Sequence, residues 1–265
     1  CHIQKVNQKW FYIGKSQVQS PGDGIQLENC RNFTIRNCQI DRTDTGNKFC
    51  IIANHSKNGR IENNVLMGPL EKGDGGAGIY LGAETDTVII NNNKISFSPC
   101  GIYSHAGINY VYRNVFKANS VGSWFININK AIILNNVYWN NPVALKGSAL
   151  KVFNNIFYAS ALSDHLMHLH EACETDYNCY FIRQPDMLFE KHGKLPAYTF
   201  QTGNGENSVF ADPLLSNPEQ ADFSLQKGSP CIDKGIGEVE GWGVIDKNCG
   251  EAIDIGAIEW CAGNE

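Results

Sequence analysis

The hexapeptide Ile61-Glu62-Asn63-Asn64-Val65-Leu66 has a pattern that recurs along the chain. Each copy has an apolar residue, a polar pair and one or two further apolar residues. The copies lie at 35–40, 61–66, 90–95, 111–116, 133–138 and 152–157, and their fourth residues are Cys38, Asn64, Asn93, Asn114, Asn136 and Asn155. These fourth residues follow one another at intervals of 26, 29, 21, 22 and 19 residues. A unit of this size indicates a solenoid, in which each turn stacks on its neighbours.

A second phrase, in which apolar and polar residues alternate, accompanies most copies. It occurs at 24–29, 50–55, 78–83, 101–106, 123–127 and 144–147. Such alternation predicts a half-buried strand. We therefore expect two strands in each turn, joined by bends rich in Asn, Gly and Asp. The asparagines are predicted to be structural, because Asn tolerates a left-handed backbone and can pair with the Asn one turn away.

Residues 10–182 resemble, in this rhythm, the right-handed parallel β-helix of the pectin-lyase-like superfamily. Four segments of the tail are similar to the C-terminal segment of bacterial secreted β-helix proteins: 210–215 (FADPLL), 222–225 (DFSL), 228–235 (GSPCIDKG) and 254–259 (DIGAIE). Many of those proteins are polysaccharide-degrading enzymes or lie beside them. The resemblance implies an extracellular polysaccharide as the ligand, although kinship of fold does not by itself give a reaction.

The predicted architecture is an all-β, right-handed parallel β-helix solenoid with a loop-rich C-terminal closure. Residues 1–182 are expected to form the β-helix. Residues 183–265 break its rhythm and are expected to form an excursion and a C-terminal segment that pack on the same helix, so the chain is one domain. The excursion is too short to bury a core of its own.

Composition limits the classes of partner. The 265 residues are 42% hydrophobic and 18% charged, with a net charge of −5, which predicts a folded protein. No basic stripe is visible, so we expect no nucleic-acid partner. No apolar run approaches the roughly 18 residues of a membrane span. We expect a monomer.

The ten cysteines show no metal-binding spacing. Cys30, Cys38, Cys50 and Cys100 are predicted to be small buried apolar residues of the stack. A disulfide among Cys231, Cys249 and Cys261 is the alternative for the tail, and it would imply export. We expect a secreted, periplasmic or cell-surface protein. Cys1 is also a candidate for the acylated cysteine of a bacterial lipoprotein.

Two outward columns are predicted by aligning the alternating phrases. Ile25, Ile51, Ile79 and Ile102 should point inward. One outward column then holds Gln26, Ile52, Tyr80 and Tyr103, continued by Trp124, and a neighbouring column holds Glu28, Asn54, Gly82 and His105. Turns lie about 4.8 Å apart, so these side chains should touch. Aromatic faces beside polar groups suit a sugar chain, and Tyr80, Tyr103 and Trp124 are the predicted platforms.

A polysaccharide lyase is the favoured reaction class. It removes the proton next to a uronate carboxyl and needs a base, a group that neutralises the carboxylate and often a cation. His105, Lys146, His168 and His170 are the candidates for acid and base work. His55 and Glu28 are candidates for substrate contacts, and Arg60 or Lys57 for neutralising the substrate carboxylate. Calcium stays a candidate cofactor, with the acidic loop 71–74 as its only suggested site.

Three alternatives stay open. A non-catalytic carbohydrate-binding or adhesion module would show aromatic and polar groups without a convergent titratable cluster. A glycoside hydrolase needs two suitably spaced carboxyl groups, and no pair among Glu28, Asp41, Asp44, Asp74, Glu84 and Asp86 stands out by spacing. His168 and His170 with Glu171 could also hold a transition metal.

Overall fold

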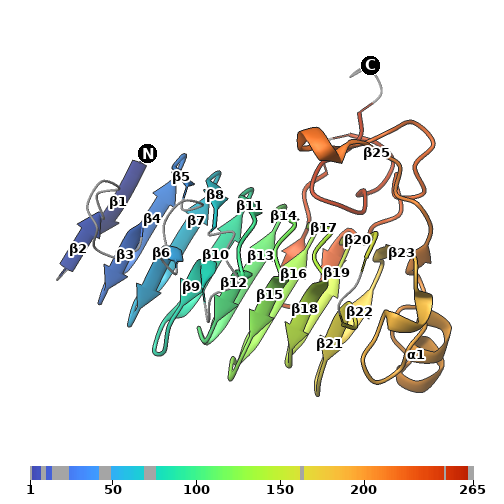
Figure 1. Cartoon of the computed structure of the whole chain (residues 1–265), viewed down its shortest axis with the longest axis horizontal. Helices are drawn as coiled ribbons and strands as arrows, with labels where there is room; N and C mark the ends of the chain where they lie inside the picture. The colour runs from blue at the N-terminus through green and yellow to red at the C-terminus, as the bar shows by residue number, and fades with distance from the viewer. Residues whose placement is uncertain are drawn as a thin grey trace.

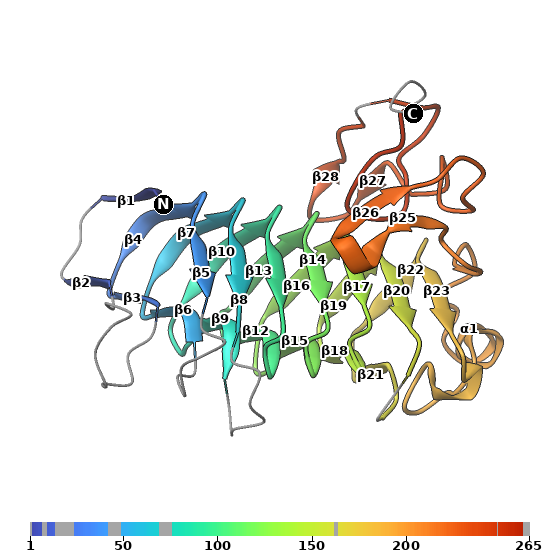
Figure 2. The same ribbon diagram turned by 45° about the horizontal axis from the view of Figure 1, so that its top comes forward.

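The computed structural model is a parallel β-solenoid that carries a C-terminal segment along its side (Figures 1 and 2). It describes residues 2–6, 10–13, 24–41, 49–68, 76–161, 164–247 and 249–261. Three sheets, each of eight strands, make up the solenoid. The predicted all-β parallel β-helix is therefore confirmed.

The strands of each sheet come from successive turns and pair in parallel, except that β1 and β2 pair antiparallel with β4 and β3. Sheet A contains β1 (His2–Val6), β4 (Arg31–Arg36), β7 (Lys57–Glu62), β10 (Asp86–Asn91), β13 (Ile108–Tyr112), β16 (Lys130–Leu134), β19 (Leu150–Phe153) and β22 (Glu174–Asp176). Sheet B contains β2 (Trp10–Ile13), β3 (Ile25–Glu28), β6 (Phe49–Asn54), β9 (Ala77–Leu81), β12 (Cys100–Ser104), β15 (Val121–Phe125), β18 (Val143–Gly147) and β21 (Met167–Leu169). Sheet C contains β5 (Gln39–Asp41), β8 (Val65–Met67), β11 (Lys94–Ser96), β14 (Val115–Lys117), β17 (Val137–Trp139), β20 (Ile156–Ala159), β23 (Cys179–Ile182) and β24 (Val209–Phe210).

Each turn has three strands, and the prediction of two was wrong. The recurring hexapeptide spans the corner between sheets A and C. In the copy at 61–66, β7 ends at Glu62 and β8 begins at Val65. Asn63 makes the bend between them with a φ of 55°, a left-handed conformation that Asn tolerates. The strands of sheet C are too short, at three residues in β8, for alternation to reveal them in the sequence.

The fourth residues of the hexapeptides form a buried ladder of side-chain hydrogen bonds. The backbone N–H of Asn64 donates to the Oδ1 of Asn93 at 3.0 Å, and its own Nδ2 donates to the same oxygen at 2.9 Å. The same pair of contacts continues through Asn114, Asn136, Asn155 and Asn178. The predicted structural role of these asparagines is confirmed.

The interior is filled by in-register stacks. Ile25, Ile51, Ile79 and Ile102 are buried, as the alternation predicted. From sheet C, the rings of Phe116, Tyr138, Phe157 and Tyr180 stack on one another with centroids 4.5, 5.0 and 5.3 Å apart. Cys30, Cys38, Cys50 and Cys100 are also buried, as predicted, and Cys38 in addition takes part in a disulfide.

The excursion after β23 lies at the last turn. It contains η1 (Pro185–Met187) and α1 (Leu195–Thr202) before the chain returns to sheet C at β24. The ring of Phe189 stacks on that of Tyr198 at 4.0 Å and meets Tyr180, the last ring of the interior stack, edge to face. Of the helices in the described ranges, none is long and apolar enough to cross a membrane.

The C-terminal segment covers the outer faces of sheets C and A. It carries the hairpin β25 (Leu215–Asn217) and β26 (Asp222–Leu225) with η2 (Pro218–Gln220) between them, then β27 (Glu238–Val239) and β28 (Gly243–Val244). Phe223, Leu225, Cys231 and Ile255 pack on the outward residues Val115, Val137, Ile156 and Cys179 of sheet C. Val239 and Trp242 pack on Ile132 and Leu134 of sheet A. Sheet B receives no such covering in the described residues.

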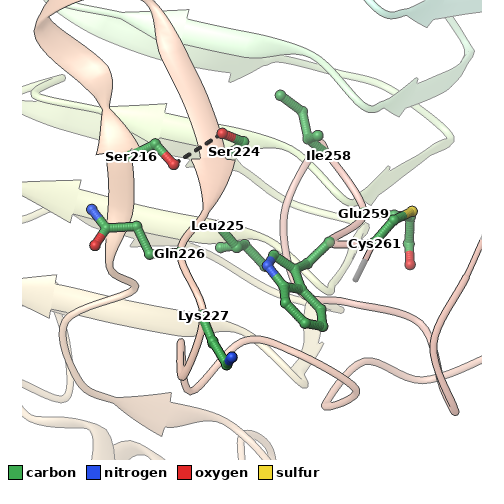
Figure 3. A pocket seen from close by; sticks show the side chains of 9 residues that line it. Ser216, Ser224, Leu225, Gln226, Lys227, Ile258, Glu259 and Cys261 are labelled. Carbon is green, nitrogen blue, oxygen red and sulfur yellow. Dashed lines mark hydrogen bonds between the residues drawn. The ribbon is translucent and has the colours of Figure 1, made fainter. Parts of the chain in front are cut away.

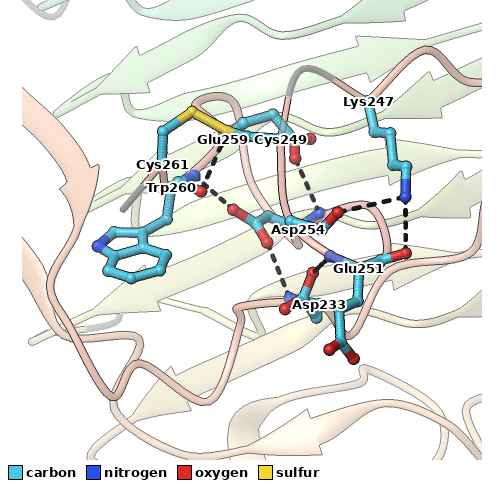
Figure 4. The surroundings of a disulfide bond; sticks show 9 residues. Asp233, Lys247, Cys249, Glu251, Asp254, Glu259, Trp260 and Cys261 are labelled. Carbon is cyan, nitrogen blue, oxygen red and sulfur yellow. Dashed lines mark hydrogen bonds between the residues drawn. A yellow bond between two sulfur atoms is a disulfide. The ribbon is translucent and has the colours of Figure 1, made fainter. Parts of the chain in front are cut away.

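A disulfide joins Cys249 to Cys261 near the end of the chain (Figure 4). This pair is one of those predicted among the three tail cysteines. Inside the loop that it closes, the Asp254 carboxylate accepts hydrogen bonds from the backbone N–H groups of Asp233 and Trp260. The tail is therefore held by a covalent bond and by buried polar contacts together.

Replacing Asn136 by alanine should lower the free energy of unfolding by about 2–4 kcal/mol. The change leaves the buried N–H of Asn114 without its acceptor, and removes the amide that donates to Val111 and Leu134. Urea unfolding followed by circular dichroism measures the loss. The exposed Asn129 gives the matched control, and its replacement by alanine should change the free energy by less than about 0.5 kcal/mol. Equal midpoints for the two variants would show that the ladder does not stabilise the fold.

Candidate functional site

The outer face of sheet B carries one column of residues in strict register. Gln26 is paired with Ile52, Ile52 with Tyr80, Tyr80 with Tyr103, and Tyr103 with Trp124. This is the alignment predicted from the sequence. The register adds Lys146 beside Trp124 and His168 beside Lys146. We call these seven residues the sheet B column.

Aromatic rings occupy the middle of the column. The centroid of the Phe49 ring lies 4.9 Å from that of Tyr80, which lies 5.6 Å from that of Tyr103. The ring of Trp124 stacks on that of Tyr103 at 5.1 Å. Trp124 is 37% exposed, a large fraction for a residue of this size in a packed sheet. The row is a continuous aromatic strip, partly exposed at Tyr80 and Tyr103 and most exposed at Trp124.

His105 lies beside this strip. It directly follows β12, and its ring centroid lies 5.0 Å from that of Tyr103 and 6.2 Å from that of Tyr80. Its backbone N–H donates to Leu81, which places it next to Gly82 in the second predicted column. The imidazole therefore adds a polar edge to the aromatic surface.

The end of the column towards the last turn is ionic. The Nζ of Lys146 lies 5.5 Å from the centre of the Trp124 ring, close enough for a cation–π contact. The imidazole of His168 lies between two carboxylates: Nε2 is 3.3 Å from Asp164 and Nδ1 is 3.1 Å from Glu190. We call Lys146, His168, Asp164 and Glu190 the ionic end.

The contacts at the ionic end stabilise the charged form of the Asp164 carboxylate. The backbone N–H of His165 donates to it at 2.7 Å, and this bond is the main reason that the pKa of Asp164 is lowered. The charges of His168 and Lys146 lower it further. Its side chain is nearly half exposed, and the His168 side chain is only 9% exposed. A ligand on this face therefore meets Asp164 and Lys146 before it meets His168.

Sequence reasoning did not assign Asp164 and Glu190 to the site. Asp164 is the first residue of the histidine-rich stretch 164–171, and its place beside these histidines is the sequence signal that could have found it. Glu190 comes from the irregular excursion, where residue 189 forms an isolated parallel bridge with Met167 and the N–H of Glu190 donates to the Met167 carbonyl. No spacing in the sequence indicates this contact.

The remaining predicted site residues lie elsewhere. At the opposite end of sheet B, His55 Nδ1 is 2.7 Å from the Glu28 carboxylate, and both side chains are partly exposed. His170 follows β21 and is exposed. Arg60 lies in β7 of sheet A, where it pairs with Glu62, so it is on another face from the column. This placement disagrees with its predicted role beside the substrate. The acidic loop 71–74 is outside the described residues.

The predicted acid and base residues fall into two groups. Lys146 and His168 are register partners, whereas His105 is separated from His168 by three strand spacings, which is about 14 Å. The structure therefore brings Lys146 and His168 together and leaves His105 among the aromatic rings. In the part of the chain that is described, no three His, Cys, Asp or Glu side chains lie close enough to hold a metal ion.

A cavity of about 310 Å³ lies in the tail (Figure 3). Ser216 and Ser224 of the hairpin line one side, with their hydroxyls 3.0 Å apart, and Glu259 and Trp260 line the other. Burial and, to a smaller extent, the charge of Asp254 raise the pKa of Glu259 to about 7. This cavity belongs to the tail and not to sheet B.

The family comparison agrees with the solenoid. A family model described as "Periplasmic copper-binding protein (NosD)" matches residues 4–179, which is more than half of the chain. The chain belongs to this family. The NosD match covers the β-helix through the first residue of β23 and stops before the excursion and the tail. A search of curated proteins finds no match.

Stability should fall as the pH rises from about 4.5 to about 7, in part because of Glu259. The folded protein keeps the proton on this carboxyl up to about pH 7, whereas the unfolded chain loses it near the ordinary value of 4.5. The unfolded state thus binds fewer protons across this window, and the unfolding free energy declines with pH. Melting temperatures at pH 5 and pH 8 should therefore differ less in Glu259→Gln than in the wild type. Glu206→Gln, at an exposed position, is the control, and a Glu259→Gln profile that matches it would contradict the expectation.

Proposed function

We propose that the protein binds a polysaccharide along the outer face of sheet B and cleaves it by β-elimination at the ionic end. The observation that carries this proposal is the sheet B column, in which an aromatic strip leads into Lys146 and His168. The ligand class is a uronate-containing chain outside the cytoplasm. The family's periplasmic description and the Cys249–Cys261 disulfide both support an exported location.

The shape of the face supports a polymeric ligand. Each strand adds one residue to the column at about 4.8 Å, so a linear chain lying along the solenoid axis meets a new side chain at each step. Sugar rings stack on Tyr80, Tyr103 and Trp124 through their apolar faces. The sugar hydroxyls form hydrogen bonds with His105 and with the residues of the ionic end.

Chemistry at the ionic end follows from the groups present. The Lys146 amine stands beside Trp124 and faces a sugar bound on that ring. In β-elimination, a base removes the proton next to the uronate carboxyl, the glycosidic C–O bond breaks, and the leaving oxygen takes up a proton. Lys146 is assigned the role of the base, because its amine is the titratable group nearest to a sugar bound at Trp124. His168 is assigned a positioning role, because its imidazole lies between Asp164 and Glu190 and is almost covered.

Copper does not enter this proposal, although the family description names it. Copper sites in proteins combine imidazole, thiolate and thioether ligands. Within the described ranges no three His, Cys, Asp or Glu side chains are placed to hold a metal ion, and both nitrogens of His168 already face carboxylates. The described residues therefore do not fit a copper centre, and no step is assigned to the metal. Calcium stays a candidate cofactor without an assigned site.

Removing one ring of the strip should weaken polysaccharide binding about tenfold. Trp124→Ala and Tyr103→Ala each remove a stacking surface worth about 1.4 kcal/mol, which corresponds to a factor of ten in Kd. Isothermal titration calorimetry against a panel of uronic and neutral polysaccharides measures the change. Phe200 in α1 is 92% exposed and lies off this face, so Phe200→Ala is the matched control and should bind normally. If all three variants keep wild-type affinity, the ligand does not lie on sheet B.

Elimination should be visible as a rise in absorbance near 235 nm, because each cleavage creates an unsaturated uronate. Lys146→Met should lower kcat at least about 100-fold, the usual effect of losing an acid–base group. His168→Gln should lower kcat with little change in KM. Lys227→Met in the tail is the control and should leave the rate unchanged.

The outcomes separate the alternatives. A flat absorbance trace with measurable binding would replace the lyase by a non-catalytic carbohydrate-binding module. New reducing ends without the absorbance change would indicate a glycoside hydrolase and make the carboxylates of the ionic end the catalytic candidates.

A further inference from the structure

Two buried cysteines meet where the tail lies on the β-helix. Cys179 begins β23 and continues the outward column of sheet C, in register with Ile156. Cys231 belongs to the tail and packs in the same apolar cluster. Both side chains are fully buried, and neither is in a disulfide in this structure. The two side chains lie in one cluster, and the Cys231 thiol helps to raise the pKa of Cys179.

Their surroundings fix both sulfurs in this position. The Cys179 thiol donates to the carbonyl of Ala211 at 3.3 Å. The backbone N–H of Cys231 donates to the Ser229 hydroxyl at 3.2 Å, and its carbonyl accepts from Ile255 at 2.9 Å. The other tail cysteines are already joined to each other as Cys249–Cys261, so Cys231 is left with Cys179 as its neighbour. The positions are 52 residues apart in the sequence.

We propose that Cys179 and Cys231 form a second tail disulfide, which bonds the C-terminal segment to sheet C of the β-helix. The two thiols lose two protons and two electrons as the sulfur–sulfur bond forms. A protein or small-molecule disulfide, such as oxidised glutathione, takes up the electrons and is reduced to two thiols. An oxidising compartment supplies such an oxidant. The bond forms before or during docking of the tail.

The order of events follows from the burial of the pair. Thiol–disulfide exchange needs a thiolate, and contact with Cys231 together with burial holds the pKa of Cys179 well above its usual range. Once the tail has closed, both cysteines of the reduced pair are buried, so neither sulfur can reach and attack a disulfide oxidant. A protein that folds fully reduced therefore keeps these thiols until the tail opens. The disulfide, once made, holds the tail on the outer face of sheet C.

Peptide mapping of the full chain tests the proposal. The protein is refolded with oxidised and reduced glutathione, alkylated in denaturant without reductant, digested and analysed by mass spectrometry. We expect a peptide pair that joins Cys179 to Cys231, two hydrogen masses lighter than its two thiol peptides. Cys100, which is buried in sheet B and is a free thiol, is the internal control and should be recovered in alkylated form. Recovery of Cys179 and Cys231 as alkylated thiols would overturn the proposal. Stoichiometric binding of Cu(I) by the reduced Cys179 and Cys231 thiols would also overturn it.

Thermal unfolding gives an independent readout. In a Cys38→Ala/Cys249→Ala/Cys261→Ala protein, reductant should still lower the melting temperature by roughly 5–10 °C, because the loop between Cys179 and Cys231 is released. Adding Cys179→Ala and Cys231→Ala should abolish most of that shift, whereas adding Cys100→Ala should not. An equal shift in all three proteins would show that another bond responds to the reductant. Polysaccharide binding to sheet B is measured separately, so failure of this disulfide leaves the proposed function standing.

Discussion

The corner between sheets A and C imposes the constraint on which the solenoid depends. There the chain leaves one ladder of backbone hydrogen bonds and enters another, so buried N–H groups need acceptors from outside the strands. The asparagine side chain supplies one: its oxygen accepts from the turn before, and its amide donates to backbone carbonyls, as Asn114 does to Ile90 and Tyr112. A second, shorter ladder joins Ser98, Asn119 and Asn141 at the corner between sheets C and B in the later turns. The two longest intervals, 26 and 29 residues, place their extra residues between sheets C and B.

The tail covers the outer faces of sheets C and A, and this covering distinguishes them from the outer face of sheet B. Its apolar residues cover sheet C around Val137 and Ile156 and cover sheet A around Ile132 and Leu134, so those outward side chains serve stability. The aromatic residues of sheet B have no comparable partner among the described residues, and Trp124 stays exposed. Burial of apolar surface stabilises a fold by about 25 cal/mol per Å², and the exposed part of the Trp124 side chain does not contribute this stabilisation. A role in ligand binding gives a reason for that arrangement, which the packing of the protein alone does not.

The sequence predicted the fold well because the solenoid repeats short-range signals. The inward isoleucines and the column from Gln26 to Trp124 follow from alternation within single strands. The ladder follows from the asparagine that recurs as the fourth residue of the hexapeptide. The third sheet was missed because its strands have about three residues and begin inside that hexapeptide. The ionic end was predicted only in part. Lys146 and His168 continue the column, whereas Glu190 reaches it from an irregular excursion whose path no local pattern encodes.

The order of side chains along sheet B restricts how a ligand can lie there. From Tyr80 to His168 the column spans four strand spacings, about 19 Å, with rings first and ionic groups last. A small ligand would use only one end of such a strip. The proposed polymer would use all of it, because stacking would hold the chain while only the unit beyond Trp124 would meet Lys146. The Glu28–His55 pair lies towards the other end of sheet B, away from Lys146. In the proposed function, binding energy and chemistry are separated along one axis, and the proposed reaction is confined to the turns nearest the excursion.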